Sequence, residues 1–230
     1  MIYKPTTIQE ALEIRIANPD TSVYLAGGTD DLRLGGAAEG KDLIDINALG
    51  LDTIEVKDGK LFIGARVTLQ KLIDSDLVPC FIKEAAKFCA SFAKRNSATI
   101  GGNLGLRRDD SYLAAALCAA EAELICMTRE GEKQRNVFDY LNSECRCLIE
   151  YIVIDADRKG WVKRFGNTSS SHATLIGAES CGIYALSVHG SGIACDKRPD
   201  LYASMKFTDD LTGGADYKKY LAKTVFELRR

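Results

Sequence analysis

The sequence predicts an α+β fold with mixed sheets. Short apolar runs bounded by turn residues alternate along the chain with segments whose apolar residues recur at helical spacing. The 230 residues are 46% hydrophobic, which is enough to bury a sizeable core. Thirty basic and 32 acidic side chains, without a long block of like charge, give no sign of a nucleic-acid or anionic-membrane partner. We therefore expect the chain to bind a small molecule or another protein.

The first fifty residues predict one helix and two strands. The helix is expected over 7–18, where it is ended by Pro19, and the strands over 23–26 and 43–46, which are short apolar runs. Four apolar residues at helical spacing are expected to form the inner face of the helix: Ile8, Ala11, Leu12 and Ile16.

The rest of the chain predicts a hairpin, several helices and further strands. The strands over 53–56 and 61–65 flank Asp58-Gly59, a dipeptide typical of two-residue hairpin turns. Thr68 is a favourable N-cap for a helix through about residue 75. In chain order, the periodicity predicts further helices over 79–92, 112–120, 138–141 and 217–229, and further strands over 123–128, 149–155, 160–165 and 183–188.

The segment MIYKPTTIQEALEI lacks the apolar core of a signal peptide, and no window approaches 18 uninterrupted apolar residues, so we expect a cytoplasmic protein. Its eight cysteines would then be reduced. Cys145 and Cys147 form the only close pair, and a C-x-C without a second pair is weak evidence for a metal or cluster. His172 and His189 stand alone, so no metal site is predicted.

Two stretches with paired glycines are the candidate binding elements. Successive glycines present backbone N–H groups to a diphosphate without a Cβ in the way. Ala26-Gly27-Gly28-Thr29-Asp30 follows a predicted strand, and no Walker lysine or G-x-G-x-x-G accompanies it. Alone it could be a tight turn. A second unit, Thr99-Ile100-Gly101-Gly102-Asn103, is expected to be a loop after another extended run, and the pairing favours a bound cofactor.

AGGTD followed by TIGGN resembles the signature of the FAD-binding subunit of molybdenum hydroxylases, the family of xanthine dehydrogenase and aerobic carbon monoxide dehydrogenase. LIDINAL, TIEVKDGKLFIGARVTLQKL and AELICM agree with the order of that family from about residue 3 to 155. The resemblance implies an FAD-binding fold of the vanillyl-alcohol-oxidase type. Its FAD-binding domain would span 1–158, with subdomains of about 1–52 and 53–158, and a small C-terminal α+β domain would span 159–230.

The resemblance also implies which residues hold FAD. Those expected at the pyrophosphate are Ala26, Gly27, Gly28, Thr29 and Asp30, and those expected at the flavin and ribityl side are Thr99, Gly101, Gly102 and Asn103. Arg108 and Lys163 are further candidates, although Arg107 and Arg108 could equally lie in a solvated charged turn with internal Arg–Asp pairs, and Lys163 could be an exposed strand lysine. Ile44 and Asp45 lie near the cofactor or in an ordinary buried strand.

The sequence departs from the family after TIGGN. Many members carry a Ser-Pro-x-x-Asp stretch there, whereas this chain reads LRRDDSY over 106–112 and places Tyr112 where the aspartate is expected. The polar contacts to the flavin ring are therefore expected to differ from those of the family. Asp109 and Asp110 are the nearest acidic residues.

By this resemblance the chain is an oxidoreductase subunit that is active only in a complex. Electrons would leave a molybdopterin-containing large subunit, cross the [2Fe-2S] clusters of a small subunit, reach FAD here and pass to NAD+ or another acceptor. No catalytic acid, base or nucleophile is expected on this chain. Two alternatives remain open: an independent flavin oxidoreductase of the same fold, and a non-catalytic assembly subunit with weak flavin binding.

Overall fold

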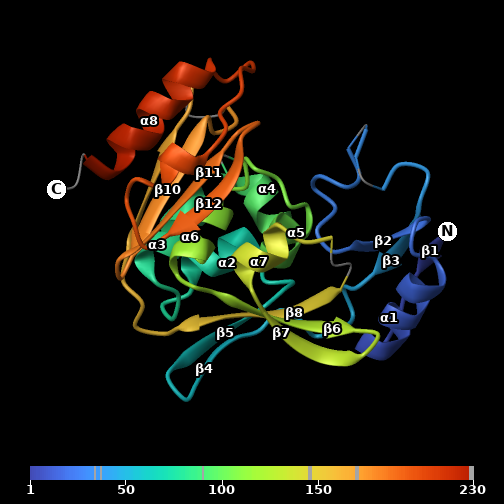
Figure 1. Ribbon diagram of the computed structural model, residues 1–230. Helices are drawn as coiled ribbons and strands as arrows, with labels where there is room; N and C mark the ends of the chain where they lie inside the picture. Colours follow the sequence, from blue (N-terminus) through green and yellow to red (C-terminus); the bar gives the residue numbers. More distant parts are fainter. Residues whose placement is uncertain (34, 37, 90, 145–146, 169–170, 228–230) are drawn as a thin grey trace.

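The computed structural model describes residues 1–33, 35–36, 38–89, 91–144, 147–168 and 171–227, and its strands form three sheets (Figure 1). We call the parts that carry them the N-terminal lobe (1–52), the central lobe (53–158) and the C-terminal lobe (159–227). In Figure 1 the N-terminal lobe is blue and lies on the right, and the orange sheet of the C-terminal lobe lies at the upper left. The predicted α+β class is confirmed.

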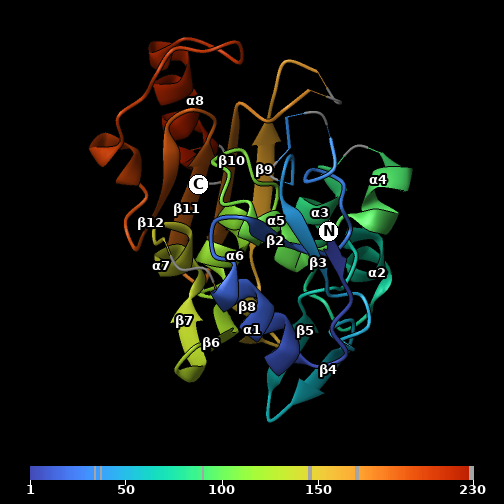
Figure 2. The same cartoon turned by 90° about the vertical axis from the view of Figure 1, so that its right-hand side faces the viewer.

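The N-terminal lobe is a three-stranded parallel sheet with one helix. The strand order is β1 (Ile2–Tyr3), β3 (Asp42–Asp45) and β2 (Ser22–Leu25). Figure 2 shows this lobe in front, with α1 (Ile8–Ala17) beside the sheet. Thr7 caps α1 as expected, by accepting a hydrogen bond from the Glu10 N–H.

One expectation for α1 is wrong. Ala11 and Leu12 are buried, but Ile16 is 39% exposed, and the partly buried Ile8 and Ile14 complete the apolar face. In the last turn of this short helix, Ile14 lies on the inner face, and Ile16 lies on the side that faces solvent.

The central lobe contains a five-stranded antiparallel sheet in the order β4-β5-β8-β6-β7. Its strands are β4 (Ile54–Lys57), β5 (Lys60–Gly64), β6 (Glu123–Thr128), β7 (Gly131–Asn136) and β8 (Leu148–Asp155). The hairpin at Asp58-Gly59 is confirmed, and both turn residues have positive φ. The edge strand β7 was not predicted, because its sequence GEKQRN lacks an apolar run.

The short helices of the central lobe pack on one another, on this sheet and on the sheet of the C-terminal lobe. They are α2 (Leu69–Asp74), α3 (Cys80–Lys87), α4 (Phe92–Ser97), α5 (Ile100–Gly105), α6 (Ala114–Ala119) and α7 (Val137–Leu141). Thr68 caps α2 as predicted. The single helix expected over 79–92 is instead α3 followed by α4, which starts at a new N-cap, Ser91. None of the described helices is long and apolar enough to cross a membrane.

The C-terminal lobe is a four-stranded antiparallel sheet between two helical layers. Its strand order is β12 (Gly192–Asp196), β11 (Ile183–Val188), β10 (Leu175–Ser180) and β9 (Trp161–Phe165). The strands predicted over 160–165 and 183–188 correspond to β9 and β11, whereas β10 and β12 were not predicted. One face packs on the core of the central lobe, and the other is covered by α8 (Ala215–Glu227), with the 3-10 helix η1 (Leu201–Ser204) beside it.

The alternation of β10 explains how two cores share one sheet. Ile176 and Ala178 belong to the large core of the central lobe, whereas Leu175 packs with Val225 of α8. Gly177 has no side chain on the α8 face, and a Cβ there would lie 2.6 Å from the Val225 side chain. The central and C-terminal lobes therefore pack as one body around a shared core.

Candidate cofactor site

A cavity of about 390 Å³ opens where the N-terminal and central lobes meet. This volume is within the range of small-molecule and cofactor sites. All the residues predicted to bind FAD line it except Lys163: Ala26, Gly27, Gly28, Thr29, Asp30, Thr99, Gly101, Gly102, Asn103 and Arg108. Two glycine stretches about seventy residues apart in the sequence thus border a single cavity.

The first glycine stretch is a loop that leaves the end of β2. Gly28 has a φ of +64°, a conformation that favours glycine. Gly27 is needed for a different reason, because a Cβ there would lie 1.8 Å from the carbonyl oxygen of Ser97. Ser97 is the last residue of α4, two residues before the second stretch. The loop therefore rests on the backbone of the central lobe, and this close contact joins the two stretches.

The second glycine stretch is the first turn of a helix and not the predicted loop. Thr99 is the N-cap of α5, and its Oγ1 accepts a hydrogen bond from the Gly102 N–H at 3.1 Å. The Gly101 N–H donates to the Ala65 carbonyl at 2.8 Å, and a Cβ on Gly101 would lie 2.7 Å from Ala65. The prediction failed because this cap and this close packing outweigh the low helix propensity of two glycines.

Asn103 connects α5 to the segment that departs from the family pattern. Its Oδ1 accepts a hydrogen bond from the Ser111 hydroxyl at 2.6 Å. Ser111 is buried, and its Oγ also accepts from the Ala114 N–H at the start of α6. The Asn103 side chain therefore orders the following loop as well as lining the cavity.

Arg107 and Arg108 are adjacent and both line the cavity, but their side chains have different partners. Arg107 has a φ of +48°, and its guanidinium lies over the Tyr140 ring, 4.3 Å from the centroid. Arg108 donates to both carboxylate oxygens of Asp110, at 2.7 Å each, and to Asp30 at 3.3 Å. The backbone of Arg107 is in the left-handed region, so the chain turns sharply between the two arginines. The turn lets Arg107 contact Tyr140 while Arg108 contacts Asp110 and Asp30.

The Arg108–Asp110 pair is a largely buried ion pair. The Asp110 side chain is only 3% exposed and that of Arg108 is 31% exposed. Burial by itself raises the pKa of Asp110, but hydrogen bonds and charge from Arg108 outweigh burial and lower the pKa. The hydrogen bond to Asp110 raises the pKa of Arg108 above its usual range. Both groups therefore stay charged at neutral pH. The pair agrees with the predicted alternative of internal Arg–Asp pairs, but Asp110 is buried and not solvated as that alternative expected.

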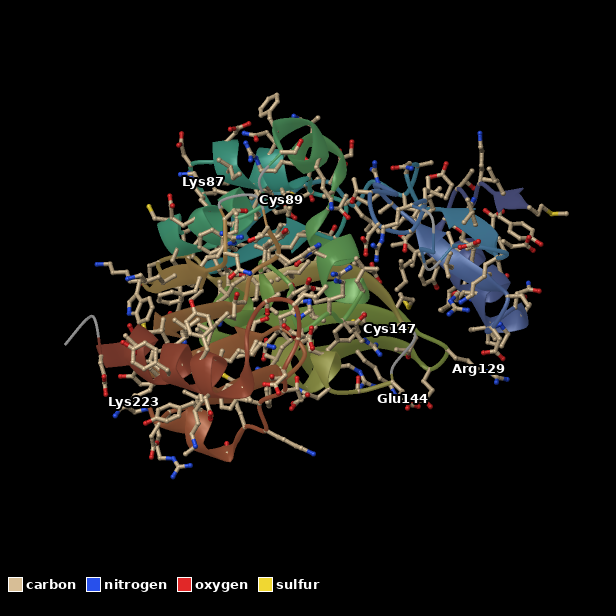
Figure 3. All side chains as sticks on the ribbon, turned by 90° about the horizontal axis from the view of Figure 1, so that it is seen from above. Lys87, Cys89, Arg129, Glu144, Cys147 and Lys223 are labelled. Atoms are coloured by element: carbon tan, nitrogen blue, oxygen red, sulfur yellow. The ribbon has the colours of Figure 1, made fainter. Side chains whose placement is uncertain are left out.

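Other residues at the cavity were not found from the sequence. Tyr24, Tyr112, Tyr140, Cys147 and His172 all line it. Figure 3 shows Cys147 on the side of the central lobe that faces the N-terminal lobe. Burial raises the pKa of Tyr140 to about 12. These residues lie far apart in the chain and carry no shared motif, so no local signal could have grouped them.

The remaining candidates lie outside the cavity. Ile44 is fully buried in the N-terminal core, and Asp45 accepts hydrogen bonds from Asn47, whose amide in turn donates to the Ala26 carbonyl at 3.4 Å. Instead, Ile46, which directly follows β3, lines the cavity. Lys163 is exposed on β9, with its ammonium over the Phe165 ring, which is the placement that the alternative of an exposed strand lysine predicts.

Neither cysteines nor histidines form a metal site in the part of the chain that the structure describes. No group of three or more His, Cys, Asp or Glu side chains is placed there to hold a metal ion. Of the close pair Cys145 and Cys147, only Cys147 lies within the described residues. Cys118 and Cys126 are fully or almost fully buried.

The chemistry of the cavity fits a dinucleotide that carries a diphosphate. Glycine backbone and the hydroxyl-bearing Thr29 line one side, and apolar side chains such as Leu69 and Ile149 line another. The described lining includes the cationic side chains of Arg15, Lys94, Arg107 and Arg108, which offset the acidic Asp30, Asp31 and Asp110. A Cβ at Gly102 would find only Thr99 Oγ1 within 4 Å, so the backbone there stays open to a ligand.

Comparison with known proteins places the chain in a family. Residues 1–154 match the model of the FAD binding domain in molybdopterin dehydrogenase. An uncharacterised Escherichia coli K12 protein, YgfM, is 31% identical over 176 residues, which cover 76% of this chain and 67% of YgfM. The caffeine dehydrogenase subunit beta of a Pseudomonas species is 26% identical over 201 residues, with the same two coverages.

Solved structures share the whole fold. Reconstituted carbon monoxide dehydrogenase from Oligotropha carboxidovorans contains a chain that superimposes with a TM-score of 0.86 at 20% identity, covering 99% of this chain and 94% of its own. The likeness extends through the C-terminal lobe, beyond the residues that the family model matches. The chain is therefore a member of the family of FAD-binding domains of molybdopterin dehydrogenases, and its cofactor is FAD.

Proposed function

We propose that this chain is the electron-transfer subunit of a cytoplasmic molybdenum hydroxylase of the xanthine dehydrogenase type. In this proposal it assembles with a molybdopterin-containing large subunit and a [2Fe-2S] small subunit. Electrons reach FAD on this chain from the clusters and leave to NAD+ or another acceptor. FAD supplies the chemistry of this junction, because it exchanges electrons singly or in pairs.

One observation carries the proposal: a single cavity brings both glycine stretches together with Arg108. The stretch Ala26–Asp30 would present backbone N–H groups to the pyrophosphate, with Thr29 adding a hydroxyl. The carboxylate of Asp30 does not oppose this role, since Arg33 and Arg108 both pair with it. Thr99 to Asn103 would border the ribityl and flavin side.

The domain organisation belongs to the same proposal. Residues 1–158 would hold the cofactor, with subdomains of about 1–52 and 53–158, and residues 159–230 would form a small C-terminal domain. The three sheets support this organisation, because all strands of each sheet lie within one of these three residue ranges. The relative named as subunit beta supports a role inside a larger assembly.

Purification of the tagged chain from the cells that produce it tests the proposal. We expect visible flavin absorbance, FAD as the released cofactor, and co-purifying protein that contains molybdenum and iron. FAD with turnover by the isolated chain would indicate an independent flavin oxidoreductase instead. Molybdenum and iron without flavin would indicate an assembly subunit.

A matched pair of variants tests the site. Gly102→Asp adds a carboxylate to the cavity lining, and we expect it to abolish FAD retention, because the added charged group would take up space on the ribityl and flavin side. Asp155→Asn removes a partner of an exposed ion pair with Lys60, outside the cavity, and serves as the control. Equal FAD content in both variants would contradict this placement of the cofactor.

A further inference from the structure

The carboxylate of Asp110 is surrounded by charged or polar groups from three parts of the chain. Arg108 donates to it twice, and His172 Nδ1 lies 3.0 Å and His189 Nε2 3.9 Å from its Oδ2. These are the only two histidines of the sequence, and both belong to the C-terminal lobe. A buried carboxylate at the edge of the cofactor cavity is thus paired with Arg108 of the central lobe and approached by both histidines of the C-terminal lobe, which contributes least to the cavity lining.

A second acidic residue anchors His189 from the far side. Asp210 Oδ2 lies 2.8 Å from His189 Nδ1 and accepts a hydrogen bond from Lys218. Lys218 is completely buried on α8, and it also donates to the carbonyls of His189 and Thr208, at 2.6 and 2.9 Å. All three donors of this ammonium are used, so the position of His189 is fixed from α8.

The loop of Asp110 also rests directly on the C-terminal sheet. The Ser187 hydroxyl, from β11, donates to the Asp109 carbonyl at 2.6 Å. A continuous series of contacts therefore runs from Lys218 through Asp210, His189, Asp110 and Arg108 to Asp30 in the first glycine stretch. Figure 1 shows α8 and the N-terminal lobe on opposite sides of the molecule.

We propose that Asp110 is a positioning residue that holds Arg108 against the first glycine stretch, and that His172 and His189 of the C-terminal lobe, the latter anchored by Asp210, hold Asp110 in turn. Without Asp110, the Arg108 guanidinium would lose its two shortest contacts and keep only the 3.3 Å contact to Asp30. The glycine stretch would then lose its link to the rest of this series. The C-terminal lobe thereby sets the affinity for FAD without supplying a main part of the cavity.

This inference rests on the proposal that FAD occupies the cavity, so its first test does not use FAD. In the apo chain with ¹⁵N-labelled arginine, the Nε–H of Arg108 should exchange slowly with solvent, because it donates to a buried carboxylate. Asp110→Asn should speed this exchange, and Asp210→Asn should do so to a lesser extent. Unchanged exchange in Asp110→Asn would overturn the proposal.

The second test is a double-mutant cycle on FAD affinity, measured by titrating the apo chain and following flavin fluorescence. Asp110→Asn should weaken FAD binding about tenfold, since a charge-assisted contact is lost. In an Arg108→Gln background the same change should weaken binding less than about twofold, because the effect acts through Arg108. Asp155→Asn is the control for a lost surface ion pair.

Three outcomes are distinguishable. Additive effects of the Asp110 and Arg108 changes would overturn the positioning role while leaving the cofactor site intact. A wild-type chain that takes up no FAD would overturn both the inference and the proposed function, even with slow Arg108 exchange. A loss of affinity that tracks the fall in melting temperature in every variant, the control included, would show a general loss of stability and would also overturn the inference.

Discussion

The two glycine stretches look alike in sequence and differ in structure. Ala26–Asp30 is a loop in which Gly28 has positive φ and Gly27 touches the backbone of Ser97. Thr99–Asn103 is a capped helix start, in which Gly101 touches Ala65. In both stretches, one glycine is required because another segment of the protein packs directly against it. Room for a ligand is only part of the reason for the glycines. A glycine pair in a cofactor motif is therefore also a packing requirement between segments.

The largest effect is expected from Gly27→Ala. A Cβ 1.8 Å from the Ser97 carbonyl oxygen cannot be accommodated by moving a flexible side chain, so the backbone must shift. We expect a loss of about 3 kcal/mol in the free energy of unfolding, together with loss of FAD. Urea unfolding and FAD titration measure the two effects. Wild-type stability would mean that the two stretches do not pack as described.

Gly101→Ala should have the next largest effect, about 2 kcal/mol in the free energy of unfolding. The added Cβ would lie 2.7 Å from both the Cβ and the carbonyl oxygen of Ala65. Combining it with Ala65→Gly removes one of these contacts and should restore part of the stability, as measured by urea unfolding. An unimproved double variant would assign the cost to the backbone contact alone.

Thr99→Val tests the cap that makes the second stretch a helix. Loss of the Oγ1 acceptor leaves the Gly102 N–H without its cap, which should cost about 1 kcal/mol. Thr99→Ser keeps the hydroxyl and should retain most of the stability. Thermal unfolding of both variants measures the two effects. If both variants lose the same amount, the methyl group of Thr99 contributes as much as its hydroxyl, and the cap alone does not explain the stability of this helix start.

The smallest effect, and the only stabilising one, is expected from Gly105→Ala. A Cβ there meets no atom within 4 Å, and the residue lies at the exposed end of α5 with no positive φ. Reduced backbone freedom in the unfolded chain should add about 0.5 kcal/mol to the free energy of unfolding. A destabilised variant would show that α5 is less regular in solution than described.

Local sequence signals predicted most of the fold and the two stretches at the site. The hairpin at Asp58-Gly59 and the cap at Thr68 depend on neighbouring residues, so the sequence pattern was sufficient. The edge strand β7 was missed because a solvated edge needs no apolar alternation. The helix α5 was missed because its stability comes from a cap and from contact with Ala65.

The sequence by itself determined that the chain is an α+β protein and that two glycine stretches with the AGGTD and TIGGN pattern resemble an FAD-binding family. The tertiary structure alone decided how the divergent segment 106–112 works. There Arg108 pairs with Asp110, and His172 and His189 approach Asp110 from about sixty to eighty residues further along the chain. Local patterns report backbone preferences, whereas such contacts depend on long-range packing that brings distant residues together.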